Sequence, residues 1–100
     1  MRVTLPHTLG REEVRRRMHQ HGDEIGGYFP PGMAHVETSW PNDDFMALDI
    51  NAAGQKITGG IEVEDDSVTI EMDLPPMLGF LRGTIENAVR KHGGRLLEKN

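Results

Sequence analysis

The chain contains no cysteine, which excludes a disulfide framework and a thiolate metal site. It also lacks a long apolar run, since no stretch approaches the roughly 20 apolar residues of a membrane-spanning helix. The opening sequence MRVTLPHTLG has no apolar segment of signal-peptide length. These absences predict a soluble, cytoplasmic protein without a membrane span.

Basic residues are outnumbered, because 11 lysines and arginines stand against 16 aspartates and glutamates, with a formal net charge of -5. Phosphate contacts require a basic surface, so this balance argues against a nucleic-acid partner. Two segments expected to be helical, 10–29 and 76–100, together carry a net charge of +3, and the rest of the chain carries -8. Both charged surfaces are most simply interpreted as solvated faces.

The length of 100 residues fits a single domain over residues 1–100. A chain of this size buries roughly two-thirds of the surface that its unfolded form exposes. That is enough for one modest core, and a roomy ligand cavity would compete with it directly.

Four consecutive segments alternate apolar and polar residues, and the turns PNDD, AAGQ and DDS separate them. This period of two predicts an antiparallel meander with one buried face. The positions expected to point inward are Ala34, Val36, Thr38, Trp40, Met46, Leu48, Ile50, Ala52, Ile57, Ile61, Val63, Val68, Ile70, Met72 and Leu74.

An acidic ladder occupies the opposite positions of the last two segments, GGIEVEDDSVTIEMDL. Its members Glu62, Glu64, Glu71 and Asp73 are expected to face water, as one side of a two-layer fold must. Carboxylates suit calcium and magnesium, but the spacing lacks the aspartate-rich loop and closing glutamate of an EF-hand. The pattern therefore favours a solvated face over a cation site.

A first helix is predicted in LGREEVRRRMHQHGDEIGGYF, where Val14, Met18 and Ile25 share one apolar face. It follows a short first strand in RVTLPHT. Two ion pairs of i,i+4 spacing are expected on the outer side of this helix, Glu12 with Arg16 and Glu13 with Arg17.

A second helix is predicted from Pro76, with Gly93 and Gly94 as C-cap residues. Gly79 and Gly83 are expected to let this helix approach the sheet closely. Its predicted apolar stripe is Leu78, Leu81, Ile85, Ala88 and His92.

The expected fold class is therefore α+β, a two-layer antiparallel sheet in the order β-α-β-β-β-β-α. A long C-terminal helix lies across the sheet in this arrangement, which matches the helix-grip or TATA-binding-protein-like order. The match concerns the order of elements alone and says little about function.

Catalytic machinery is scarce in the sequence. No G-x-S-x-G motif is present, and His19 and His21 are two residues apart, which places them on different helical faces. His92 near a helix C-terminus has an ordinary electrostatic role there. We therefore expect no catalytic, cofactor-binding or metal-binding residues, no cofactor, and no enzymatic activity.

One feature exceeds what a minimal core requires. In LPPMLGFL, Met77 and Phe80 flank the core positions, and with Tyr28 and Phe29 they are predicted to form an exposed apolar contact patch. Such a patch suits a hydrophobic partner or a homodimer contact. The alternative is that the curved sheet buries these side chains, because a small domain is short of core.

Three stretches resemble the polyhydroxyalkanoic acid system family of small bacterial proteins. They are PHTLGREEVRRRM, DDFMALDI after a tryptophan, and AAGQKITGGIEVEDDSVTIEMDLPPMLGFLRGTIENAVRKHGGRLLE. Within them the motifs are L-G-x-x-E opening a basic helix, G-x-I-x-V-x-D-D-x-V as a hairpin, and L-P-x-x-L entering the last helix. The resemblance covers nearly the whole chain except roughly residues 22 to 34.

The resemblance implies a cytoplasmic, non-enzymatic accessory role in polyhydroxyalkanoate storage, with the granule or a granule coat protein as partner. It carries over no catalytic residue. Three other interpretations remain open. They are a small helix-grip module that binds a lipid-like ligand, an enzyme acting on polyester intermediates, and a homodimeric structural protein with the patch at its interface.

Overall fold

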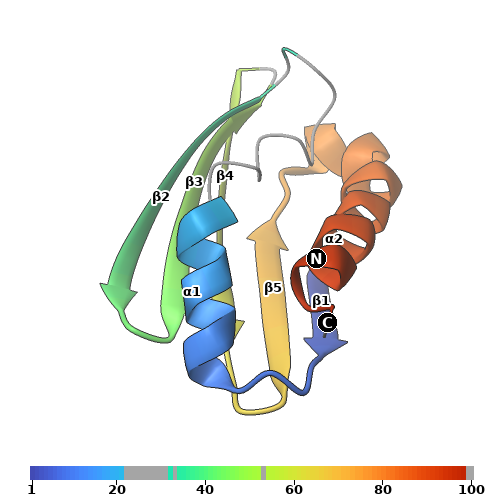
Figure 1. The fold of residues 1–100 in the computed structure, drawn as a ribbon. Coiled ribbons are helices and arrows are strands. Elements are labelled where there is room, and N and C mark those ends of the chain that lie inside the picture. Colours follow the sequence, from blue (N-terminus) through green and yellow to red (C-terminus); the bar gives the residue numbers. More distant parts are fainter. Residues whose placement is uncertain (22–31, 33, 53, 99–100) are drawn as a thin grey trace.

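The structure is a computed structural model and describes residues 1–21, 32, 34–52 and 54–98. The described residues form a sheet with helices on one side of it (Figure 1). The predicted order of strand, helix, four strands and helix is confirmed, with one 3₁₀ helix added before the last helix. The elements are β1 (Arg2–Pro6), α1 (Arg11–His21), β2 (Ala34–Asn42), β3 (Phe45–Ala52), β4 (Gln55–Val63), β5 (Ser67–Asp73), the 3₁₀ helix η2 (Pro76–Leu81) and α2 (Arg82–Leu96).

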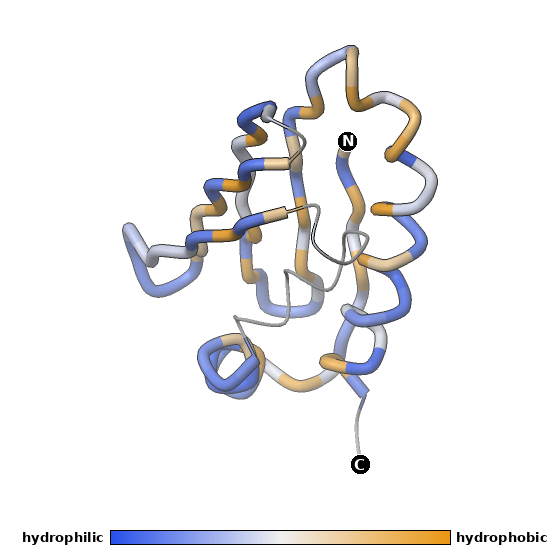
Figure 2. The backbone as a smooth tube through the Cα atoms, turned by 90° about the horizontal axis from the view of Figure 1, so that it is seen from above, coloured by the Kyte–Doolittle hydropathy of each residue, from blue (hydrophilic) through white to orange (hydrophobic). Residues whose placement is uncertain are grey.

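The five strands form one antiparallel sheet in the spatial order β1-β5-β4-β3-β2. Strands β2 to β5 are the predicted meander, and β1 joins at its end with Val3 opposite Ile70 of β5. The alternating apolar residues of the strands are visible along the chain in Figure 2. Because all pairings are between antiparallel neighbours, only one face of the sheet needs cover.

The core lies between the inner face of the sheet and the two helices. Val14 and Met18 of α1, and Ile85 and Val89 of α2, belong to one cluster with the buried strand residues. Every predicted inward position of β3 is buried, whereas on β2 the inward Thr38 is exposed. The helices therefore cover the sheet unevenly, and β2 receives the least cover.

The apolar stripe of α2 differs from the prediction. Val89 and Gly93 are buried, whereas the predicted positions Ala88 and His92 are only half-buried. The α-helix begins only after η2, so the buried positions from Ile85 onward follow four-residue steps.

The roles predicted for the glycines of this segment were wrong. Gly79 and Gly83 are exposed with open space around them, so they bring nothing close to the sheet. Gly93 is no C-cap residue, because α2 continues to Leu96. It lies inside the helix, where the side chain of Leu5 occupies the space that a Cβ atom would need.

The ion pairs on α1 were predicted in part. Glu13 and Arg17 pair at 2.7 Å, as expected. Arg16 pairs with Glu13 at 2.5 Å, three residues away, whereas it was expected to pair with Glu12. Positions three apart are also neighbours on a helix surface, and a single carboxylate serves both arginines.

Arg17 also connects the two helices. Its guanidinium donates hydrogen bonds to the backbone carbonyls of Leu96 at 2.7 Å and Glu98 at 2.6 Å, where α2 ends. A cation at a helix C-terminus satisfies carbonyls that have no partner within the helix. Glu13 therefore orients an arginine that fastens α1 to α2.

We expect Gly59→Ala to lower the free energy of unfolding by about 1–3 kcal/mol. A Cβ atom on Gly59 would overlap the backbone carbonyl oxygen of Glu71, which is held in the β4–β5 ladder. Gly83→Ala is the matched control, because open space surrounds this helical glycine, and it should stabilise by about 0.4–1 kcal/mol. Urea denaturation measures both, and equal stability of Gly59→Ala and wild type would contradict this close approach.

Stability should fall in acid through Glu13. Hydrogen bonds from Arg16 and then Arg17 lower the pKa of the Glu13 carboxyl from 4.5 to about 2. A carboxyl whose pKa is depressed by folding stabilises the protein above its unfolded pKa, and this contribution disappears as pH falls through the folded pKa. Wild type should therefore lose more stability than Glu13→Gln between about pH 5 and pH 2.

The measurement is urea denaturation across that range at constant ionic strength, with the neighbouring Glu12→Gln as control. The control should keep the pH dependence of wild type. Parallel curves for wild type and Glu13→Gln would show that the Glu13 pairs do not stabilise the fold.

Candidate functional site

The most exposed large apolar side chains of the described residues lie on η2. Met77 is 72% exposed and Phe80 is 71% exposed, whereas Leu78 and Leu81 in the same short helix are buried. With about three residues per turn, positions three apart lie above one another on a 3₁₀ helix. The two leucines therefore anchor η2 in the core, and Met77 and Phe80 project into solvent. We call these two exposed residues the η2 patch.

Two of the four residues of the predicted contact patch are thus exposed, and their role as a contact stays a prediction. The other two, Tyr28 and Phe29, lie outside the described residues. Gln55 at the start of β4 was not predicted to be near, yet its Nε2 lies 3.7 Å from the sulfur of Met77. The two residues are 22 positions apart, so the sequence does not reveal this neighbour, which depends on where the start of β4 meets η2.

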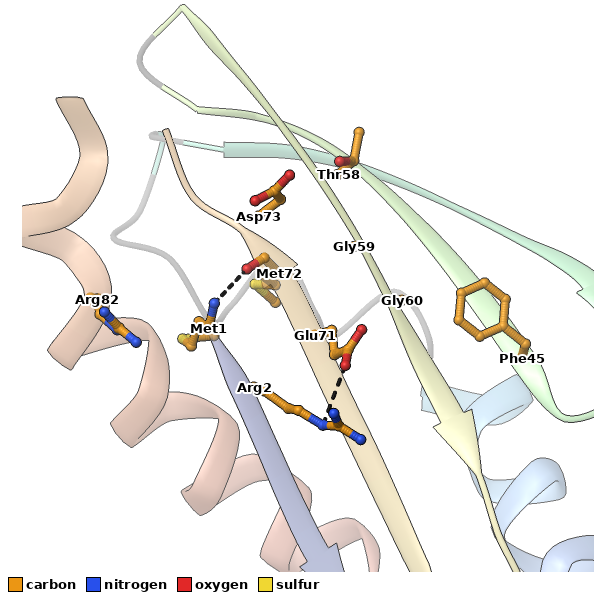
Figure 3. Close-up of a pocket in the computed structure, with 10 residues that line it drawn as sticks. All are labelled: Met1, Arg2, Phe45, Thr58, Gly59, Gly60, Glu71, Met72, Asp73 and Arg82. Carbon is orange, nitrogen blue, oxygen red and sulfur yellow. Dashed lines mark hydrogen bonds and ion pairs between the residues drawn. The ribbon is translucent and has the colours of Figure 1, made fainter. Parts of the chain in front are cut away.

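A wide depression of about 680 Å³ opens on the outer face of the sheet (Figure 3). It forms where Gly59 and Gly60 leave β4 without side chains, and the ring of Phe45 lies across Gly60. Its lining residues are Met1, Arg2, Phe45, Thr58, Gly59, Gly60, Glu71, Met72, Asp73 and Arg82.

The charged groups of this depression do not converge on a common point. Arg2 pairs with Glu71 at 3.3 Å across the β1–β5 ladder, and both side chains are more than half exposed. Glu62 and Glu64 are exposed as well, as predicted for the acidic ladder. Within residues 1–21, 32, 34–52 and 54–98, no group of three or more histidines or acids is arranged to hold a metal ion.

His7 is a buried histidine whose hydrogen bonds belong to the fold. The backbone N–H of Leu9 lies 3.2 Å from Nδ1, which must therefore accept, so Nε2 carries the proton and donates to the carbonyl of Glu64 at 3.1 Å. Both bonds require the neutral ring. His7 thus joins the chain entering α1 to the β4–β5 turn.

Arg11 fastens the start of α1 to two strand turns. Its Nε donates to Asp65 at 2.6 Å, and its Nη1 donates to Asp44 at 2.8 Å. Hydrogen bonding to Asp65, with the charge of both acids, raises the pKa of the guanidinium above its ordinary value. Arg15 approaches Asp44 as well, at 3.3 Å. These convergent charges serve to position α1.

Among the described residues, two hollows lie between the helices and the inner face of the sheet. The wider one, of about 520 Å³, lies between α1 and the strands β2 and β3, and its lining residues are Met18, His19, Gln20, Val36, Thr38, Trp40 and Met46. A second cavity, of about 30 Å³, is close to the space that one water molecule takes in liquid. Its lining residues are Leu5, Met18, Ile61, Val68, Ile70, Gly93, Leu96 and Leu97. The sequence argument against a roomy cavity therefore stays a prediction.

The fold and its surfaces define a small α+β domain with an exposed apolar segment at the entry to its last helix. The family model described as "putative polyhydroxyalkanoic acid system protein" matches residues 1–97, so the chain belongs to this family. No curated protein and no solved structure matches the chain. The helix-grip or TATA-binding-protein-like assignment accordingly stays a prediction. Among the helices described, none has the length and apolar character needed to cross a membrane.

We expect His7→Ala to lower the free energy of unfolding by about 1–3 kcal/mol, because it leaves the Leu9 N–H and the Glu64 carbonyl without their partner. Thr8→Ala, at the exposed neighbouring position, is the control and should change stability little. Thermal unfolding of the three proteins makes the comparison. A His7→Ala protein that unfolds together with wild type would show that the two hydrogen bonds contribute nothing.

Proposed function

We propose that this protein is a cytoplasmic, non-enzymatic accessory of the polyhydroxyalkanoate storage system that contacts the granule, or a granule coat protein, through the η2 patch. The observation that carries the proposal is the exposure of Met77 and Phe80. Membership of the polyhydroxyalkanoic acid system family is consistent with a granule partner and supports this choice. A hydrophobic polyester surface offers the kind of contact that these side chains make.

The binding free energy expected from these two side chains favours reversible attachment. Complete burial of a methionine or phenylalanine side chain contributes about 1.5–3 kcal/mol, so the two together supply at most about 6 kcal/mol. A micromolar dissociation constant needs about 8 kcal/mol. The η2 patch alone therefore supports weak binding, which several copies on one granule would strengthen.

The packing of η2 against the core supports the proposal further. Leu78 and Leu81 are 2% and 4% exposed, so their burial fixes the position of η2 on the domain. Binding then requires little ordering of the backbone, and side-chain entropy is the main cost. The acidic outer face of the sheet would stay in contact with water.

A lipid-like ligand held between the helices and the sheet is the weaker alternative. Lipid-sized ligands fill pockets of several hundred Å³, and the cavity between both helices and the sheet measures about 30 Å³. The hollow of about 520 Å³ between α1 and β2 is large enough, but the polar side chains of His19, Gln20 and Thr38 form part of its lining. The exposed η2 patch needs no such cavity. Surface contact is therefore the function that these residues support best.

The test is sedimentation of the purified protein with purified polyhydroxyalkanoate granules. Wild type should sediment with the granules and resist washing at high salt, because apolar contact is not screened by ions. The double variant Met77→Ser with Phe80→Ser should stay folded, since both positions are exposed, and should lose at least nine-tenths of the sedimented protein.

The matched control is Asn87→Ser with Lys91→Ser, two exposed positions further along α2. This control should sediment like wild type. Retention of the Met77 and Phe80 double variant would refute the η2 patch as the contact. Release of wild type by salt alone would point to charge as the attractive force and would also count against the proposal.

A further inference from the structure

The two edges of the sheet are protected very differently. At one edge, β1 has five residues, ends at Pro6, and packs against α2. At the other edge, β2 has nine residues and pairs only with β3 within the described part of the chain. An unpaired edge exposes a row of backbone donors and acceptors that another strand can use.

β2 has few of the features that usually prevent another strand from pairing with an edge strand, such as proline, a bulge or an inward charge. Pro41 and the register shift lie at its far end, between Ser39 and Asn42. Ahead of them the pairing with β3 is regular from Ala34 to Ser39, and no charged residue occupies an inward position. Val36 and Trp40 on the inward side are only half-buried. Six consecutive residues are thus suited to a further strand.

We propose that a second copy of this chain pairs with β2 in antiparallel register centred on Val36. In this register His35 of each copy lies opposite Glu37 of the other copy, and Val36 lies opposite its own counterpart. Ala34 lies opposite Thr38 on the same side as Val36. The two sheets become one continuous ten-stranded sheet.

Complementary side chains select the second copy and the register. His35 Nε2 and Glu37 Oε1 lie 3.7 Å apart on the outer face of one chain, and both side chains are about three-quarters exposed. An imidazole N–H can donate a hydrogen bond to a carboxylate on the opposite strand, whereas two directly opposed carboxylates repel each other. Centring on Glu37 would oppose two glutamates, whereas centring on Val36 forms two His–Glu pairs.

The inward side gains cover from the same pairing. Thr38 is exposed and Val36 half-buried there, and the contact from α1 to this strand is the His19 ring stacked on Trp40, with ring centroids 4.2 Å apart. A twofold axis perpendicular to the sheet keeps the helices of both copies on one side and the acidic ladders on the other. This inference does not rest on granule contact.

The oligomeric state is measured by sedimentation velocity over a range of concentrations. Wild type should reach twice the 11.2 kDa mass of the chain. Thr38→Lys should raise the dimer Kd at least tenfold, because an inward lysine would be buried against the second copy. Thr58→Lys, at an exposed position of the central strand β4, is the matched control and should stay dimeric. A monomer at all concentrations, or a dimer indifferent to Thr38→Lys, would overturn the proposal.

The natural lack of cysteine allows a direct test of register. Val36→Cys should form a disulfide-linked dimer under mild oxidation, since facing Cβ atoms lie about 4.5–5.5 Å apart. Thr38→Cys should not, because its two copies would be offset by about 13 Å along the strands. Cross-linking of Thr38→Cys in preference to Val36→Cys would overturn this register.

A last variant separates the two surfaces. Met77→Ser with Phe80→Ser should remain dimeric, since these residues lie on η2 and not on β2. Dissociation of this variant would place the dimer contact at the η2 patch and overturn pairing through β2. Loss of granule binding by a protein that remains dimeric would leave the two conclusions independent.

Discussion

Burial of one sheet face under two helices is the interaction on which the remaining structure depends. Val14 and Met18 of α1, with Ile85 and Val89 of α2, pack onto the inner strand residues as a single core. The helices have 11 and 15 residues, and they cover a sheet of five strands. Cover is therefore complete over the central strands and incomplete at β2, which explains why inward residues of that strand remain accessible.

Several polar contacts of the domain hold that layer of helices in place. Arg11 fastens the start of α1 to two strand turns, and His7 secures the segment before it. Arg17 joins α1 to the last turn of α2. Groups that would suggest chemistry if taken singly are thus engaged in fastening helices to the sheet. The two proposals instead concern surfaces, namely an apolar patch on η2 and a strand edge that is unpaired within the described residues.

These two surfaces differ in how they arise. The η2 patch exists because the chain enters α2 through a 3₁₀ turn whose leucines face inward, which leaves Met77 and Phe80 in water. The β2 edge exists because the meander ends there without a further strand in the described residues. One surface suits an apolar partner and the other suits a strand, so the two proposed contacts lie at different places on the domain.

The alternation of residues along four segments was sufficient to predict the meander and its buried face, because a strand turns successive side chains to opposite sides. The acidic ladder followed from the same local reasoning, whereas the sequence left open whether Met77 and Phe80 are exposed or buried. Local pattern did not predict that Gly93, rather than Gly79 or Gly83, lies at a close approach, since this depends on where Leu5 of another element lies. The neighbour of Met77, the shared carboxylate of Glu13 and the unequal protection of the two edges likewise arise only when distant segments meet. The sequence by itself determined the periodicity of the strands and helices. The tertiary structure decided which elements contact one another, because those contacts depend on packing between residues far apart in the chain.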